Sequence, residues 1–111
     1  MIIDFNAIET QTIDGFKDGN GLLITRNFVD ENNKIMMSRL APNANIGYHS
    51  HEQNSEIIYI LSGNGHVEYD DTSEKVSAGT VHYCPMGHSH ALYNDSASDE
   101  LIYFAIVPEH H

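Results

Sequence analysis

Residues Gly47–Gly63, with the sequence GYHSHEQNSEIIYILSG, join a polar segment to a short run rich in β-branched and aromatic residues. Turn residues bound the run Ser55–Leu61 on both sides, which favours a strand. Alternate side chains of an extended backbone point to the same face, so Glu56, Ile58 and Ile60 would share one side. The stretch therefore predicts a strand with a carboxylate and an apolar pair on its inner face.

Runs of this kind recur along the whole chain, and no segment of useful length repeats apolar residues at helical spacing. An edge strand is also expected near Ile2–Asn6. There is no linker, so the sequence predicts one all-β domain over residues 1–111, built as a sandwich or barrel from hairpins. The other candidate strands are Leu22–Phe28, Lys34–Ala41, His66–Asp70, Thr80–Cys84, Ala91–Tyr93 and Leu101–Val107.

The charge balance is strongly acidic: 5 Lys and Arg stand against 16 Asp and Glu, a formal net charge of −11 over 111 residues. A field of that sign repels phosphate backbones and anionic membranes, so neither nucleic acid nor a membrane is expected as a partner. Cys84 is the only cysteine, which excludes an internal disulfide. No signal peptide or membrane span is apparent, and a cytoplasmic protein is expected.

Two groups of histidines suggest a metal site. His49 and His51 face the same way if their backbone is extended, and Glu56 follows after a small turn. Imidazole nitrogen and carboxylate oxygen suit divalent first-row metals. A His-x-His pair alone is more often two surface histidines, so the interpretation depends on whether a second group joins it. That second group consists of His82, His88 and His90.

Both histidine segments resemble the motifs of the cupin superfamily. The first motif contains His-x-His, three or four residues, Glu, six residues and Gly, and His49–Gly63 reproduces this spacing. The second runs Gly, five residues, Pro-x-Gly, two residues, His, three residues, Asn, and GTVHYCPMGHSHALYN, Gly79–Asn94, matches it throughout. One departure lies at the leading glycine of the first motif, because one residue separates Gly47 from His49 where the family has five.

The resemblance is to a small single-domain cupin of the RmlC-like kind and implies a jelly-roll barrel, or double-stranded β-helix. It implies that His49, His51, Glu56 and His90 converge on one divalent metal inside the barrel. The ion would be manganese, iron, nickel or zinc. The remaining motif positions would be structural, with the asparagine bonded to nearby backbone; they are Gly63, Gly79, Pro85, Gly87 and Asn94.

Four apolar or aromatic residues near the motifs are candidates for substrate contact, although such side chains in a jelly roll usually belong to the core. His88 is expected to be solvated near the mouth of the barrel, with proton transfer near the metal as the alternative. The facing of His82 depends on strand register and stays open. The four candidates are Tyr69, Tyr83, Leu92 and Tyr103.

Arg39 could face inward and anchor a substrate carboxylate, but an exposed or interface position is favoured. His110 and His111 close the chain and are either native or the remains of a purification tag, so they do not enter the site.

Three classes of function remain open. The first is a metalloenzyme acting on a small polar molecule, of isomerase, dioxygenase, lyase or decarboxylase type. The second is a metal-dependent module that binds a small molecule, such as a sugar, without turnover. The third is a structural protein whose site is a relic. Catalysis would need an acid or base beyond the ligands, and none stands out near the motifs. Unpaired sheet edges also suggest a homodimer.

Overall fold

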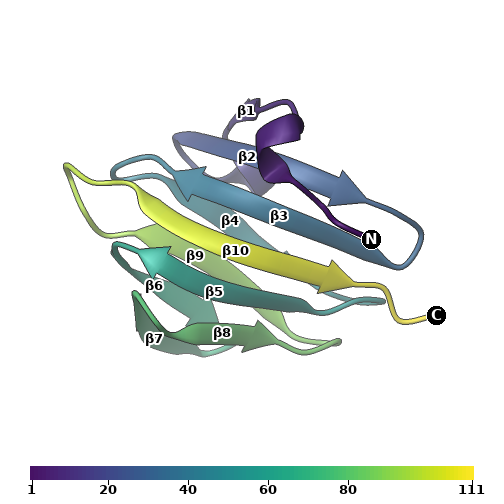
Figure 1. Ribbon diagram of the computed structural model, residues 1–111. Coiled ribbons are helices and arrows are strands. Elements are labelled where there is room, and N and C mark those ends of the chain that lie inside the picture. Colours follow the sequence, from purple (N-terminus) through teal and green to yellow (C-terminus); the bar gives the residue numbers. More distant parts are fainter.

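The computed structural model describes all residues 1–111 and is all-β apart from two short 3₁₀ helices, η1 (Phe5–Ala7) and η2 (Phe16–Asp18) (Figure 1). No helix has the length and apolar character needed to cross a bilayer. The strands are β1 (Gln11–Asp14), β2 (Leu22–Val29), β3 (Asn33–Leu40), β4 (Asn45–Ser50), β5 (Glu56–Ser62), β6 (Asn64–Tyr69), β7 (Thr72–Ser77), β8 (Val81–Cys84), β9 (Ser89–Asn94) and β10 (Leu101–Pro108).

The strands form two sheets that pack face to face. One sheet has the order β1-β2-β3-β10-β5-β8 and the other the order β4-β9-β6-β7, and the pairings between strands are antiparallel. In Figure 1, β3, β10 and β5 lie toward the viewer, and the fainter β4 and β9 lie behind them. This arrangement is the jelly-roll barrel that the motifs implied.

Alternation along each strand places the core between the sheets. In β10 the residues Leu101, Tyr103, Ala105 and Val107 are buried, while the residues between them are partly exposed. Ile60 in β5 is fully buried, which stabilises the fold by about 1.5–3 kcal/mol relative to an exposed side chain. The predicted alternation in β5 is confirmed.

Seven of the eight strands expected from the sequence are present, with their ends displaced by at most two residues. The strand expected at Ile2–Asn6 was wrong. This segment instead contains η1, because the carboxylate of Asp4 accepts a hydrogen bond from Asn6 N–H at 3.0 Å and turns the chain locally.

Two motif residues explain how the loops are fixed. Gly63 adopts φ 104°, and a Cβ there would lie 2.8 Å from the carbonyl oxygen of Glu100. The side-chain amide of Asn94 donates to the carbonyls of Leu40, Ala41 and Asp99 at 3.0, 3.0 and 2.8 Å. Asn94 therefore bonds distant backbone as well as the nearby backbone that the sequence suggested.

A close backbone contact joins η2 to β4. A Cβ on Gly47 would overlap the carbonyl oxygen of Lys17, and one on Gly19 would overlap that of Asn45. Lys17 and Asp18 adopt left-handed conformations, with φ 57° and 62°, which cost about 1–2 kcal/mol each in a non-glycine residue. The leading glycine, unusual in its spacing, thus lets η2 pack directly on the strand that carries His49.

Candidate metal centre

The structure brings together the four side chains that the cupin resemblance singled out. His49 lies in β4 and His51 follows its end, while Glu56 begins β5 and His90 lies in β9. The register of β4 on β9 places His49 directly opposite His90. One possible ligand atom from each of the four lies within 4.8 Å of the others. The cluster therefore draws on both sheets.

Hydrogen bonds to Nδ1 orient the first two imidazoles. Nδ1 of His49 lies 2.7 Å from the carbonyl oxygen of Gly47, so it must carry the proton and donate. Nδ1 of His51 lies 2.6 Å from Oδ1 of Asn54. The amide nitrogen of Asn54 donates to the carboxylate of Glu109 at 3.2 Å, which fixes the orientation of the amide so that its oxygen faces the ring of His51. Both rings therefore present an Nε2 lone pair to the cluster.

The third imidazole is oriented by another histidine. Nδ1 of His90 lies 3.0 Å from Nε2 of His82, which is only 4% exposed and borders the buried Cys84. Burial, and then the neighbouring His90, lower the pKa of His82 to about 4, so His82 is neutral and able to accept the proton of Nδ1. His82, which sequence reasoning left open, faces the interior as the support of His90.

The free nitrogens converge on the carboxylate. Nε2 of His51 lies 3.0 Å from Nε2 of His90, and these atoms lie 3.3 and 3.0 Å from Oε1 of Glu56. With each Nδ1 protonated, these lone pairs would repel one another unless a proton or a cation lies among them. Three imidazole nitrogens and one carboxylate oxygen are a donor set for first-row divalent ions, so the residues present fit such a metal.

The charge state of the cluster also suits a cation. Burial opposes ionisation of Glu56, yet hydrogen bonds with His51 and His90, which need a proton on Nε2 when no cation is bound, lower its pKa to about 2. Burial likewise opposes a charge on His51, but the hydrogen bonds with Glu56 and Asn54 raise its pKa. Burial lowers the pKa of His49, which keeps that ring neutral. At neutral pH Glu56 is therefore ionised, and the groups in direct contact with its carboxylate are imidazole rings.

A cavity of about 360 Å³ opens beside His49, His51 and Glu56, and its wall includes Lys17 and Lys34. A smaller space of about 40 Å³ continues into the barrel, bounded by His49, Glu56 and Tyr103. His90 lies behind the other ligands and is 2% exposed. A small ligand in the cavity could therefore reach one side of the cluster.

The four candidates for substrate contact differ in position. Tyr103 is buried and borders the smaller space, and burial raises the pKa of its hydroxyl. Leu92 belongs to the core. Tyr69 packs against His82 at one side and stacks on His88 at the other. Tyr83 is 53% exposed on the outer face of β8, which corrects the expectation that it lines the cavity.

The remaining charged candidates lie outside the cluster. His88 is partly exposed and bonds Asp70 through Nδ1 at 2.6 Å, which agrees with a solvated position. Arg39 is exposed and pairs with Glu100 at 2.9 Å, so it does not face inward. Near the C-terminus, His110 bonds the hydroxyl of Ser55 at 2.9 Å. His111 bonds the carbonyl oxygen of Glu31 at 3.1 Å.

Sequence reasoning missed two kinds of site residue. Asn54 stands three residues after His51, a spacing at which an amide in a turn reaches back to the ring, so a local signal existed. No local sequence signal marked Lys17 and Lys34, because they reach the cavity only through the packing of η2 on β4 and the position of β3.

The two facing sheets and the enclosed His/Glu set define a jelly-roll barrel with a candidate metal site. The family model described as the cupin domain matches residues 36–107, and the chain belongs to this family. The chain is also similar to an oxalate-binding protein of Thermotoga maritima, with 26% identity over 96% of this chain and 93% of the relative.

Solved structures agree with the fold. A predicted oxalate decarboxylase from Thermotoga maritima superposes with a TM-score of 0.90 at 23% identity, covering 98% of this chain and 99% of that one. An RmlC-like cupin from Shewanella frigidimarina gives a TM-score of 0.78 at 16% identity, covering 94% of this chain and 86% of that one. These likenesses confirm the jelly roll as the fold.

Proposed function

We propose that the protein holds one divalent first-row metal on His49, His51, Glu56 and His90 and binds a small carboxylate at the exposed side of that site. The observation that carries the proposal is the orientation of the rings. Nδ1 of His49 and of His51 bonds an oxygen acceptor, and Nδ1 of His90 meets a neutral imidazole, which directs the three Nε2 lone pairs at one carboxylate. Manganese, iron, nickel and zinc all accept these ligands.

The ligand class is supported by the relative named an oxalate-binding protein and by the size of the cavity beside the cluster. A bound metal would act as a Lewis acid that attracts carboxylate oxygen. His49, His51 and Glu56 border the cavity, so a ligand would meet the metal from that side. Oxalate is the first ligand to test.

The experiment combines metal content with ligand titration. Metal per chain is measured by mass spectrometry on protein purified without added metal, followed by calorimetric titration of the metal-loaded and the chelator-treated protein with oxalate. We expect near-stoichiometric metal and oxalate binding that needs it. A variant with both His110→Ala and His111→Ala controls for adventitious metal at the C-terminus. Wild-type protein that takes up no metal would refute the proposal.

Catalysis is the second candidate, because the cavity gives a ligand direct access to the cluster. For oxalate the simplest reaction is decarboxylation, in which the carbon–carbon bond breaks and a proton replaces the lost carbon dioxide to give formate. Binding is favoured because the other carboxylates bordering the cavity, Asp30 and Glu109, already accept hydrogen bonds. Formate released by metal-loaded protein, and absent with the Glu56→Gln variant, would establish turnover.

We also propose that the protein is a homodimer, through the outer face of the six-stranded sheet and not through a sheet edge. Two rows of apolar side chains cross β3, β10, β5 and β8 on this face, and none of their members is charged. In a chain of net charge −11, a second copy can meet such a face without bringing carboxylates together. The rows are Ile35–Ile106–Ile57–Tyr83 and Met37–Phe104–Tyr59–Val81.

Light scattering at micromolar concentration tests the dimer. We expect a dimer mass for the wild type and a monomer mass for Tyr59→Asp, because Tyr59 lies within one row and is 41% exposed. Tyr48→Asp is the matched control, since Tyr48 is similarly exposed but lies in β4 of the other sheet. A monomer mass for the wild type would rule out the interface.

A further inference from the structure

Cations are scarce in this chain, and two of them border the cavity of the candidate metal centre. The sequence has five Lys and Arg, and Lys17 and Lys34 both contribute to the cavity wall beside His49, His51 and Glu56. The arginines are committed elsewhere, since Arg39 pairs with Glu100 and Arg26 bonds Thr10 and the carbonyl oxygen of Phe5. Two of the few cations of this acidic protein therefore border one cavity, which they share with the carboxylates of Asp30, Glu56 and Glu109.

One aromatic ring holds both lysines. The ammonium nitrogens of Lys17 and Lys34 lie 5.6 and 5.7 Å from the centroid of the Phe16 ring. Attraction to the ring positions the two ammonium groups, although like charges gathered at one ring repel each other. An anion that binds to both would relieve that repulsion.

The charge of the lysines is available to a ligand. Neither Lys17 nor Lys34 forms an ion pair with a carboxylate of the chain. The carboxylates that share the cavity wall are otherwise engaged: Asp30 accepts from the backbone N–H groups of residues 32 and 33, and Glu109 accepts from Asn54. A hydrogen bond does not cancel the charge of a carboxylate, but it occupies part of its acceptor capacity, whereas the two ammonium groups have no hydrogen-bond or ion-pair partner in the chain.

The fold maintains the position of Lys17 against a conformational cost. Lys17 and Asp18 are held at positive φ, and the carbonyl of Lys17 fits against Gly47, where no side chain could be accommodated. Gly47 belongs to β4, the strand that also carries His49. Lys17 is therefore fixed relative to the candidate metal ligands, and it does not depend on a free loop.

We propose that Lys17 and Lys34, gathered on Phe16, form a second anchoring point that makes the cavity selective for dianions. One carboxylate of the ligand lies at the His/Glu cluster and the other at the two ammonium groups. This inference rests on the proposed binding of a small carboxylate, whose substrate class it narrows to short dicarboxylates. The lysines contribute to selectivity and not to metal retention.

The test uses Lys17→Gln, Lys34→Gln and the double variant, with Lys75→Gln as the matched control, because Lys75 is an exposed cation in β7 outside the cavity. Metal content, oxalate affinity and acetate affinity are measured for each. We expect the double variant to keep its metal, to lose roughly tenfold or more in oxalate affinity, and to bind acetate much as the wild type does. Lys75→Gln should match the wild type throughout.

Arginine at both positions should restore selectivity, because the charge returns, which separates a charge effect from a packing defect. Unchanged oxalate affinity in a double variant that retains metal would overturn the inference while leaving the proposed function intact. Absence of oxalate and malonate binding by metal-loaded wild type would overturn both.

If the wild type proves to hold no metal, the proposed function fails and the metal-free protein still tests the lysines. Malonate is then titrated at low salt and followed by amide chemical shifts. Shifts at residues of the cavity wall that vanish in the double variant would support the anion site. No shifts in the wild type would overturn it.

Discussion

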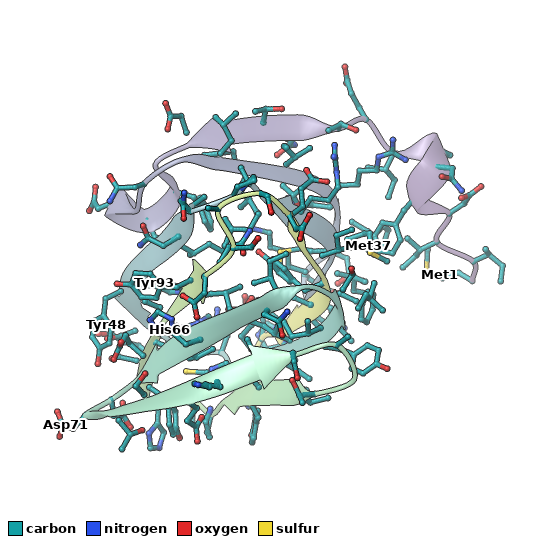
Figure 2. The ribbon with its side chains drawn as sticks, turned by 90° about the vertical axis from the view of Figure 1, so that its left-hand side faces the viewer. Met1, Met37, Tyr48, His66, Asp71 and Tyr93 are labelled. Carbon is teal, nitrogen blue, oxygen red and sulfur yellow. The ribbon has the colours of Figure 1, made fainter.

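Histidines lie beside carboxylates in two regions of this molecule, and only one region has the geometry of a metal site. Outside the barrel, His66 bonds Asp95 at 2.7 Å and stacks on Tyr93, and His88 bonds Asp70 at 2.6 Å. Figure 2 shows the labelled His66 and Tyr93 close together on one side of the molecule. Inside it, three rings bond backbone oxygen, amide oxygen or a neutral imidazole through Nδ1 and turn Nε2 to a shared point.

The two regions differ in the group that forms a hydrogen bond with Nδ1 of each imidazole. At His66 and at His88 a different aspartate bonds Nδ1, and the two rings share no partner. A neutral acceptor at Nδ1 fixes the tautomer and directs the second nitrogen toward the cluster. Adjacent histidines and carboxylates therefore do not define the site, whereas the shared orientation does.

Loss of a ligand inside the barrel should have the largest effect. His51→Ala, His90→Ala and Glu56→Gln should each weaken metal binding by more than about 100-fold. This exceeds the loss expected on removing a residue that only hydrogen-bonds to a ligand. Metal content after dialysis against a weak chelator measures this. His66→Ala serves as the control and should retain full metal content. Equal retention by His66→Ala and His90→Ala would remove the distinction between the two regions.

Removal of the support behind His90 should have an intermediate effect. His82→Ala should weaken metal binding by about 10–100-fold, because Nδ1 of His90 loses the acceptor that fixes its tautomer. Competition with a chromogenic chelator gives the affinity. His82→Gln offers an amide oxygen in place of the imidazole and should recover part of it. If His82→Ala binds as tightly as the wild type, His82 is only a packing residue.

The surface pairs should matter little. His88→Ala should lower the free energy of unfolding only slightly and leave metal content unchanged, because the His88–Asp70 pair is exposed to solvent. Urea unfolding of the metal-free protein gives the stability. Release of the metal in this variant would show that the exterior pair supports the interior site after all.

The pH dependence of the Asp70 pair should be the smallest effect and has a definite sign. Hydrogen bonds from His88 and from the backbone N–H of Ser89 lower the pKa of Asp70 below its usual 3.8. Its stabilisation is therefore present above about pH 4 and is lost as pH falls through the lower folded-state value. The stability difference between wild type and Asp70→Asn should shrink on acidification. A difference that grows instead would contradict this sign.

Much of the fold could be predicted from the sequence, and so could the four side chains that gather at the candidate metal centre. Alternation placed the strands, and the second motif identified His90 as the partner of the His-x-His pair. β4 was missed because it is short, Gly47 interrupts it, and its other residues apart from Ile46 and Tyr48 are polar. β7 was missed because it has one buried residue, Val76, and lies at a sheet edge. Its exposed side chains resemble those of a loop.

Other parts of the site depend on packing that no local pattern encodes. The facing of His82 follows from the register of β8 on β5, which places it opposite Ile58. Lys17 reaches the cavity only because Gly19 and Gly47 bring two backbones into contact. Each motif lies within one short stretch of sequence and can be recognised from residue spacing, whereas these contacts join segments that are far apart along the chain.

The division of the candidate ligands between the two sheets has a consequence for the lifetime of the folded chain. His49 and His90 belong to one sheet and Glu56 to the other, so a bound ion would be a cross-link in a chain whose single cysteine allows no disulfide. A ligand that binds only the native state at 100 times its dissociation constant adds about 2.7 kcal/mol. The melting temperature would then rise and fall with the free metal concentration, and scarcity of the ion would expose the protein to proteolysis.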